Sequence, residues 1–302
     1  MNSNLLNPLD NMPVCDVAMG NVSLLRLDRT GGPAPGNKAF KLRENLAQAQ
    51  RLGVSRLVSF GGAWSNHLHA LAAVGRDEGL ETVGIVRGEA VLNESAMLRD
   101  ARSWGMQLVH VSRAEYQQRN ECEYLQQIKD RFAPCLVIPE GGANAEGARG
   151  CMVIAGLVKD VAPQTGRIVL SVGTGTTLAG IAAGLGSGYE VVGISALKGA
   201  GDLERRVTQA LVDCGKTDVA QWRILHDYHC GGFARSNTAL RDFMLEFENV
   251  HGVPLEPVYT GKMLFALHQL LQCGEWDCTT PVLAIHTGGL QGRRGYSWLS
   301  SA

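Results

Sequence analysis

The sequence lacks an excess of charge of either sign. Its 28 Lys and Arg residues nearly balance its 29 Asp and Glu residues, so the formal net charge is −1 over 302 residues. A chain this balanced has neither the basic surface of a nucleic-acid-binding protein nor a polybasic patch for a membrane. No apolar run reaches the roughly 18 residues needed to span a bilayer. We therefore expect neither nucleic acid nor membrane among the partners.

Cysteine pairs with the spacing of a zinc site are also missing. None of the eight cysteines belongs to a C-x-x-C pair, so we expect no metal. Disulfide frameworks are typical of short secreted chains that cannot bury a sufficient core, and this chain is long. Residues 1–12 contain no Lys or Arg and no apolar segment typical of a signal peptide. We predict reduced, mostly buried thiols in a cytoplasmic protein.

Glycine, by contrast, is abundant. It supplies 37 of the 302 residues, against an average usage of roughly 7%. The glycines form short clusters rather than a repeat, which indicates many tight loops in which the backbone closely approaches a neighbouring group.

Short β-branched runs alternate with helical periodicity from about residue 55 onward, whereas the first 40 residues look mostly irregular. This alternation, with nearly continuous apolar strands, predicts an α/β fold of parallel sheets covered by helices. Strands are expected at 57–60, 82–86, 107–111, 135–138, 168–171, 191–194 and 282–285. Helices are expected at 67–78, 93–103, 114–131, 147–161, 178–185, 203–214, 237–251 and 261–271.

The loop after strand 168–171 reads S-V-G-T-G-T-T and leads into a helix. Its glycines let the backbone approach an anion, its threonines add hydroxyl donors, and the helix N-terminus adds free N–H groups. It lacks the Gly-Lys-Ser/Thr of a Walker A loop, and Gly180 stands at the wrong spacing for a dinucleotide fingerprint. The loop therefore predicts a site for a phosphate monoester; the alternative is a tight turn with helix-capping threonines.

Three other segments carry candidate chemistry. Ser65 and Asn66, in G-G-A-W-S-N-H, stand where a helix N-cap is expected, and Ser65 with nearby N–H groups could instead hold a carboxylate. Lys38, in G-N-K-A-F-K-L-R, is either a solvated lysine or a Schiff-base lysine with a lowered pKa. Tyr259, in P-V-Y-T-G-K, is expected to open a helix. His286, in H-T-G-G, follows a predicted strand, and a single histidine in such a position is more often structural than catalytic.

Taken together, these segments resemble the 1-aminocyclopropane-1-carboxylate deaminase / D-cysteine desulfhydrase family, over residues from about 22 to about 296. The family uses pyridoxal 5′-phosphate (PLP) and has the tryptophan-synthase-β-like fold, called fold type II. The resemblance implies an α/β protein of two domains, with PLP in the cleft between them. The large domain would comprise residues 1–51 plus 144–302, and the small domain residues 52–143. It also implies a homodimer.

The resemblance implies a role for each matching residue. Lys38, rather than Lys41, would form the internal aldimine with PLP and act as general base. Asn66 would hydrogen-bond the 3′-oxygen of the cofactor, Ser65 would contact the substrate carboxylate or handle a proton, and Tyr259 would lie near the substrate. The phosphate would be held by Thr174, Gly175, Thr176 and Thr177.

The residue after the tyrosine faces the pyridine nitrogen in the family; it is glutamate in the deaminases, threonine in the desulfhydrases and Thr260 here. A hydroxyl does not keep that nitrogen protonated as a carboxylate does, so the cofactor is a weaker electron sink. A weak sink suffices to lose a good β-leaving group but suits ring opening poorly. The expected function is thus a PLP-dependent lyase of amino acid metabolism, which catalyses α,β-elimination of a D-cysteine-like substrate to a keto acid and ammonia.

One segment departs from the family. A second active-site tyrosine belongs to a G-Y-G-x-P-N stretch, but the matching residues 230–235 read C-G-G-F-A-R, with Gly231 at the tyrosine position and only Tyr228 nearby. Two alternatives therefore remain: a 1-aminocyclopropane-1-carboxylate deaminase, which is a hydrolase, or a catalytically impaired homologue that binds PLP or another phosphate ligand. A nicotinamide-dependent oxidoreductase is disfavoured by the glycine spacing.

Overall fold

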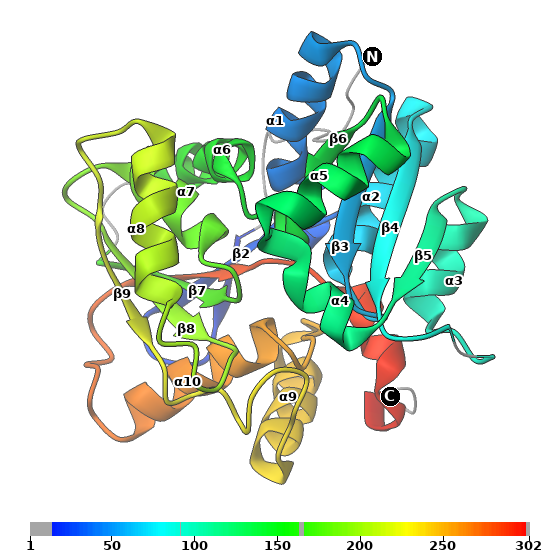
Figure 1. Cartoon of the computed structure of the whole chain (residues 1–302). Coiled ribbons are helices and arrows are strands. Elements are labelled where there is room, and N and C mark those ends of the chain that lie inside the picture. The colour runs from blue at the N-terminus through cyan, green and yellow to red at the C-terminus, as the bar shows by residue number, and fades with distance from the viewer. Residues whose placement is uncertain (1–13, 91, 163–165, 300–302) are drawn as a thin grey trace. The chain divides into compact units, whose positions relative to one another are not determined.

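The computed structural model describes residues 14–90, 92–162 and 166–299 (Figure 1). Contacts between Cα atoms divide the chain into two units. Unit 1 contains Gly31–Gly150 and the C-terminal segment from Gln291, and unit 2 contains Cys151–Leu290 and the N-terminal segment that ends at Thr30. Within the described residues the chain crosses between the units three times, which explains why no linker is visible in the sequence.

Unit 1 is built on a parallel sheet with the strand order β5-β4-β3-β6. Its strands are β3 (Arg56–Gly61), β4 (Glu81–Arg87), β5 (Gln107–Val111) and β6 (Leu136–Ile138). Its helical elements are α1 (Asn37–Leu52), α2 (Asn66–Glu78), α3 (Ala96–Ser103), α4 (Arg113–Gln117), η3 (Gln118–Asn120), α5 (Cys122–Phe132), η4 (Glu140–Gly142), most of η5 (Leu290–Gly295) and η6 (Ser297–Leu299). Helix α6 (Ala145–Val161) begins in unit 1 and ends in unit 2.

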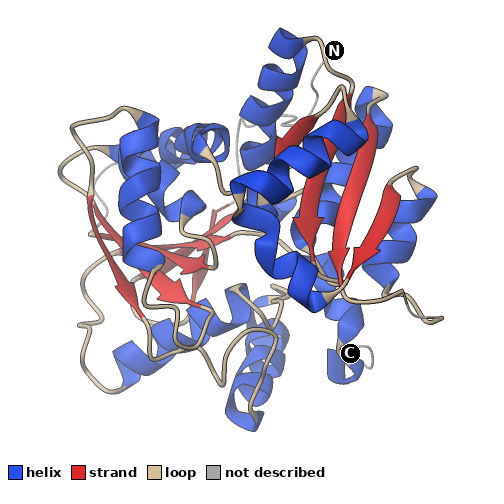
Figure 2. Ribbon diagram, viewed as in Figure 1, coloured by secondary structure: helices blue, strands red, loops and turns tan. Residues whose placement is uncertain are grey.

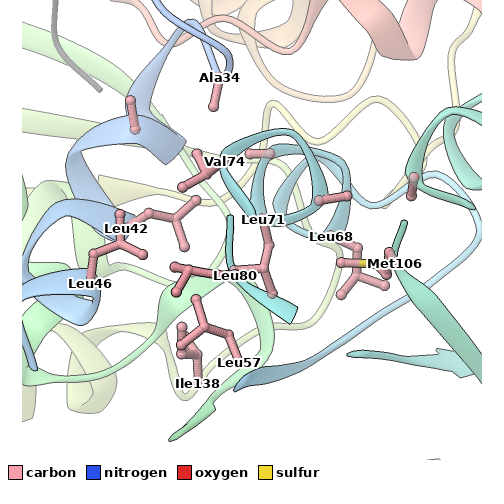
Figure 3. Packing of buried hydrophobic residues seen from close by; sticks show 14 of the residues in the cluster. Ala34, Leu42, Leu46, Leu57, Leu68, Leu71, Val74, Leu80, Met106 and Ile138 are labelled. Carbon is pink, nitrogen blue, oxygen red and sulfur yellow. The ribbon is translucent and has the colours of Figure 1, made fainter. Parts of the chain in front are cut away.

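Helices cover both faces of this sheet, as the blue and red ribbons of Figure 2 show. Neighbouring residues of β3 belong to different clusters: Leu57 joins the cluster formed with α1, α2 and α3, and Val58 joins the one formed with α4 and α5. Figure 3 shows the first cluster, in which Leu42 of α1 and Leu71 of α2 lie over Leu57. Burial on both faces is why these strands read as continuous apolar runs rather than as an alternation.

Unit 2 is built on a six-stranded sheet with the order β1-β2-β10-β7-β8-β9, in which only the edge pair β1–β2 is antiparallel. Its strands are β1 (Val14–Val17), β2 (Val22–Arg26), β7 (Arg167–Val172), β8 (Glu190–Ser195), β9 (Gln221–Leu225) and β10 (Val282–His286). Its other elements are η2 (Leu27–Arg29), α7 (Thr176–Leu185), α8 (Leu203–Cys214), α9 (Thr238–His251) and α10 (Thr260–Gln272). The predicted α/β class, with parallel sheets and covering helices, is confirmed.

Side-chain caps fix where several helices begin. The oxygens of Ser65, Ser95, Ser112 and Asn237 each accept the backbone N–H three residues later, at 3.2, 3.2, 3.1 and 2.9 Å. Such caps satisfy N–H groups that have no partner inside the helix. The predicted helix 93–103 therefore starts only at Ala96, directly after its cap.

The prediction of one helix over 114–131 is wrong. Glu121 has extended backbone angles (φ −77°, ψ 135°), so the segment is divided into α4, η3 and α5. Strands β1, β2 and β9 were not predicted. Strand β9 lies at a sheet edge, and its exposed and half-buried residues hide the apolar signal.

The expectation that the cysteines are mostly buried is also wrong. All eight are free thiols, but only Cys151 is buried. Four are half-buried, and Cys122, Cys273 and Cys278 are exposed. Cys122 is the first residue of α5 and Cys273 directly follows α10, so both exposed thiols lie at the ends of helices.

The two units differ from the two predicted domains, residues 1–51 plus 144–302 and residues 52–143. These domain boundaries remain a prediction. Residues 31–51 and 144–150 fall in unit 1 with 52–143. The reason is packing: Ala39, Leu42 and Leu46 of α1 are buried in the same cluster as Leu57 and Leu71. Among the described residues, no helix is both long enough and apolar enough to cross a membrane.

Replacing Leu71 by Ala is expected to lower the free energy of unfolding of unit 1 by about 2–5 kcal/mol, because Leu71 is fully buried and the change leaves a cavity. Urea denaturation followed by fluorescence measures the loss. Leu52→Ala, at the exposed end of α1, is the control and should change stability little. Equal effects of the two variants would contradict this account of the core.

Candidate active site

Lys38 lies in the first turn of α1, two residues after a backbone position that only glycine readily adopts. Gly36 has φ 99° and ψ −171°, a region closed to residues with a β-carbon. The half-buried Lys38 donates from Nζ to Oδ1 of Asn37 at 2.9 Å. One turn later, Lys41 is buried and its Nζ donates to the carbonyl of Gly141 at 2.9 Å. The structure thus gives Lys41 a role in joining α1 to η4, whereas Lys38 is the more accessible amine.

The loop between β3 and α2 holds Ser65 close to the backbone. A β-carbon at Gly61 would lie 2.5 Å from Oγ of Ser65, so this approach requires glycine. Ser65 Oγ accepts the N–H of Leu68 at 3.2 Å, which makes it a helix cap. A hydroxyl that accepts one hydrogen bond still has its own proton to donate. The cap and the proposed contact with a substrate carboxylate are therefore compatible.

Asn66, the first residue of α2, is oriented by a residue distant in sequence. Its Oδ1 accepts from Nε2 of Gln291 at 3.0 Å. With the carbonyl oxygen engaged, the NH₂ group is the end of the amide that remains to donate to a ligand. This is the end that the predicted contact with the cofactor 3′-oxygen needs.

The turn Thr174–Thr177 of unit 2 has the features of an anion site. Gly175 occupies the N-cap position of α7 with φ 84° and has no side chain with which to cap the helix. Oγ1 of Thr174 and Oγ1 of Thr176 are 2.9 Å apart, and Thr176 and Thr177 are buried. A helix N-terminus that lacks a side-chain cap, surrounded by hydroxyl groups, fits a phosphate group.

Tyr259 lies directly beside this turn. A β-carbon on Gly173 would lie 3.0 Å from Cε1 of Tyr259, so the ring packs against a position that only glycine can occupy. The ring of Phe233 meets that of Tyr259 edge to face, with centroids 6.3 Å apart. Phe233 stands two residues after Gly231, where the resemblance placed the second tyrosine. The aromatic residue of this stretch that reaches Tyr259 thus has no hydroxyl.

Thr260 is fully buried and hydrogen-bonded to Glu256, a residue that the sequence analysis did not single out. Its Oγ1 accepts the backbone N–H of Glu256 at 3.1 Å and lies 3.5 Å from Oε1 of Glu256. The buried Glu256 carboxylate accepts the N–H groups of Val258, Tyr259 and Thr260 at 2.6 to 2.8 Å. Glu256 therefore shapes the loop that presents Tyr259. The only signal in the sequence is a charged residue beside P-V-Y.

Two further buried side chains, those of Lys262 and His286, have structural contacts. Lys262 donates from Nζ to the carbonyl oxygens of Gly232 and Ala196 at 2.6 and 3.3 Å, which ties the segment next to Phe233 to the end of β8. His286 is fully buried, with Nε2 2.9 Å from the carbonyl oxygen of Pro254. Its contacts agree with the structural role that the sequence favoured.

Each unit brings together its own part of the predicted site. In unit 1, Ser65 and Asn66 directly precede the buried His67, whose pKa is lowered to about 3 by burial and then by the charges of Lys38 and Lys41. In unit 2, the turn Thr174–Thr177 lies beside Tyr259, and Thr260 follows it. His67 was not among the predicted site residues. The described residues contain no group of three or more His, Cys, Asp or Glu that could hold a metal ion.

Comparison with protein families finds one match, to the model described as pyridoxal-phosphate dependent enzyme, over residues 12–288. A Thermotoga maritima protein provisionally named 1-aminocyclopropane-1-carboxylate deaminase is 30% identical over 285 residues, covering 90% of this chain and 89% of the relative. The D-cysteine desulfhydrase of Klebsiella pneumoniae is 27% identical over 308 residues, covering 93% and 91%.

Solved structures agree with these matches. A crystal structure described as an ACC deaminase homologue superposes with a TM-score of 0.81 at 25% identity, covering 94% of this chain and 89% of that one. The O-acetylserine dependent cystathionine β-synthase of Helicobacter pylori shares the fold, with a TM-score of 0.66 at 12% identity and 97% coverage of both chains.

Glu256 is expected to make stability depend on pH. Burial raises its pKa from 4.5 to about 7, so between these values the folded chain binds a proton that the unfolded chain does not. Stability contributed by this group is complete below pH 4.5 and is lost as the pH rises through 7, by about 3 kcal/mol. The difference in unfolding free energy between the wild type and Glu256→Gln, measured by urea denaturation from pH 5 to 8, should change by about this amount, because other buried groups such as His67 act alike in both proteins. Glu246→Gln, on the exposed side of α9, should show no such pH-dependent difference from the wild type, and a difference for Glu256→Gln that does not change with pH would refute the assignment.

Proposed function

Because the chain belongs to the family of pyridoxal-phosphate dependent enzymes, we propose that it is a lyase that eliminates the β-substituent of a small, D-cysteine-like amino acid, releasing a keto acid and ammonia. The observation that carries this choice is the buried Thr260 directly after Tyr259, where the resemblance assigns threonine to desulfhydrases and glutamate to deaminases. D-cysteine desulfhydrases among the relatives support the same choice.

The residues present fit PLP. The uncapped start of α7 and the hydroxyl groups of Thr174, Thr176 and Thr177 suit a phosphate monoester, with Gly175 supplying the positive φ that the turn needs. The Asn66 amide, held by Gln291, supplies a donor for the 3′-oxygen. Thr260 is the candidate neighbour of the ring nitrogen. When bound, PLP withdraws electrons from the Cα of an amino acid attached to it.

The chain's own groups then supply binding and proton transfer. Lys38 would hold the cofactor covalently and, once released, take the Cα proton on Nζ as general base. Ser65 and nearby N–H groups would hold the substrate carboxylate. Tyr259 would lie against the substrate, because its ring position beside Gly173 brings it next to the phosphate turn.

The first alternative is 1-aminocyclopropane-1-carboxylate deaminase activity, a hydrolase reaction, and some relatives bear that name. Two observations disfavour it: Thr260 stands in place of glutamate, and Phe233 beside Tyr259 lacks a hydroxyl. The second alternative is a catalytically impaired homologue that binds PLP or another phosphate ligand. We also propose a homodimer in the cytoplasm, in keeping with the eight free thiols.

Borohydride reduction of the PLP-loaded protein should fix the pyridoxyl group to Lys38, as peptide mapping by mass spectrometry will show. Lys38→Ala should lose the visible absorption band of the bound cofactor, because no other lysine replaces it. Lys129→Ala, on exposed α5, should keep the band. A label on Lys41, or a band retained in Lys38→Ala, would overturn the assignment.

Keto acid release should distinguish the proposed reaction from its alternatives. D-Cysteine and β-chloro-D-alanine, which carry good leaving groups, should turn over at least tenfold faster than 1-aminocyclopropane-1-carboxylate; L-cysteine and serine complete the panel. The reason is the weaker electron sink expected beside Thr260. Fast turnover of the cyclopropane alone would establish the deaminase. PLP binding without keto acid from any substrate would establish the impaired homologue.

A further inference from the structure

Phe233 is a large apolar side chain that unit 2 leaves half exposed, next to a candidate site residue. It is 50% exposed, and its ring meets the ring of Tyr259 edge to face, with centroids 6.3 Å apart. Tyr259 in turn packs against Gly173, directly before the phosphate turn Thr174–Thr177. The open face of Phe233 therefore belongs to the same part of unit 2 as the tyrosine that is proposed to lie against the substrate.

The backbone around Phe233 adopts conformations that side chains rarely permit. Four residues of this loop have φ values between 51° and 110°: Cys230, Gly231, Gly232 and Ala234. For Cys230 and Ala234, which have a β-carbon, this region is uncommon and persists only where the surrounding structure fixes it. Conformations of this kind cluster at active sites and ligand clamps. The loop thus gives Phe233 a defined direction.

Buried charged groups hold both aromatic residues in place. Nζ of the buried Lys262 donates to the carbonyl oxygen of Gly232, the residue before Phe233, at 2.6 Å. The buried Glu256 carboxylate accepts the backbone N–H of Tyr259 at 2.6 Å. Buried charges are tolerated only where they find such partners, so the two loops are bound firmly to the interior. Phe233 and Tyr259 therefore form a preorganised pair of rings.

The position of the second tyrosine supplies space rather than a side chain. The resemblance places that tyrosine at Gly231, two residues before Phe233. Apart from the chain neighbours of Gly231, only Arg235 among the described residues lies within 4 Å of where a β-carbon would stand. Compared with the family pattern, the surroundings of Phe233 have thus lost a ring and a hydroxyl group. This part of the site is wider and less polar than the pattern implies.

We propose that the substrate carries an apolar group on its β-sulfur and that Phe233 binds this group, so that the chain acts on S-alkyl derivatives of a D-cysteine-like amino acid. This inference rests on the proposed elimination. The alkyl group would cover the open face of Phe233, in the space that Gly231 leaves. Phe233 is a specificity residue, because it touches the substituent and moves no proton. Covering both apolar surfaces removes them from water, which favours the larger substrate.

The reaction remains the same elimination with a different leaving group. Lys38 takes the Cα proton, and the bond between Cβ and sulfur breaks. The sulfur leaves with the electron pair as an alkanethiolate and takes up a proton to become a thiol. The 2-aminoacrylate that remains adds water and gives pyruvate and ammonia. No oxidant or reductant is required.

Steady-state kinetics of the PLP-loaded protein test the contact. Phe233→Ala should raise the KM of S-ethyl-D-cysteine about tenfold at nearly constant kcat, because an apolar contact stabilises bound substrate and transition state alike. The KM of D-cysteine, which has no alkyl group, should change by less than about twofold. Phe233→Leu, which keeps an apolar side chain, should retain part of the contact. Comparing variants on the same substrate cancels the difference between leaving groups.

Calorimetry reads the same contact without turnover. D-Norvaline has the shape of S-methyl-D-cysteine but no leaving group, and D-alanine lacks the alkyl extension. D-Norvaline should bind the PLP-loaded wild type about tenfold more tightly than D-alanine does, and Phe233→Ala should lose most of this preference. Leu245→Ala, which removes another exposed apolar side chain of unit 2, is the control and should keep it.

The outcomes separate this inference from the proposed function. Keto acid from D-cysteine, together with equal effects of Phe233→Ala on both substrates, would overturn the role of Phe233 and leave the elimination standing. No keto acid from any cysteine derivative would instead overturn the proposed function. If Phe233→Ala changes the oligomeric state in size-exclusion chromatography but not the preference for D-norvaline, Phe233 belongs to an interface between copies, which also overturns the proposal.

Discussion

The candidate site depends on backbone that approaches its neighbours too closely for a β-carbon. A β-carbon on Gly61 would clash with the Ser65 hydroxyl, and one on Gly173 would crowd the Tyr259 ring. At the start of α7, a β-carbon on Gly175 would clash with the Val207 side chain of α8. Gly36 and Gly175 also adopt positive φ values next to Lys38 and the phosphate turn. This constraint accounts for the glycines of the functional loops, which follow parallel strands and turn sharply into helices, whereas others, such as Gly53 and Gly79, end helices in the left-handed conformation.

Buried polar groups form a second layer of organisation behind these loops. Glu256 gathers three backbone N–H groups, and Lys262 ties two carbonyl oxygens. Lys41 holds η4 in the same way, by donating to the carbonyl oxygen of Gly141. None of these side chains needs to touch a substrate, yet each shapes a loop that carries a candidate residue. Burying such groups is tolerable because they find hydrogen-bond partners, which also holds the loops rigid.

Local patterns made much of the fold predictable. Apolar runs such as Leu57–Phe60 correspond to strands buried on both faces, and serine caps mark helix starts. The same reasoning failed where the signal was weak: the polar edge strand β9 was missed, and the 114–131 periodicity did not reveal the break at Glu121. Cysteine burial was misjudged because exposure at the ends of α5 and α10 is decided by packing.

The sequence by itself determined the family, the cofactor and the ordered set of candidate residues, because G-N-K, S-N-H and T-G-T-T place their chemistry within a few consecutive residues. Only the tertiary structure decided that Glu256 shapes the Tyr259 loop, that Phe233 meets Tyr259, and that Lys262 holds the Phe233 loop. The physical reason is that burial and hydrogen-bond partnership depend on residues far apart in the chain, such as Gly232 and Lys262, which a local pattern does not contain.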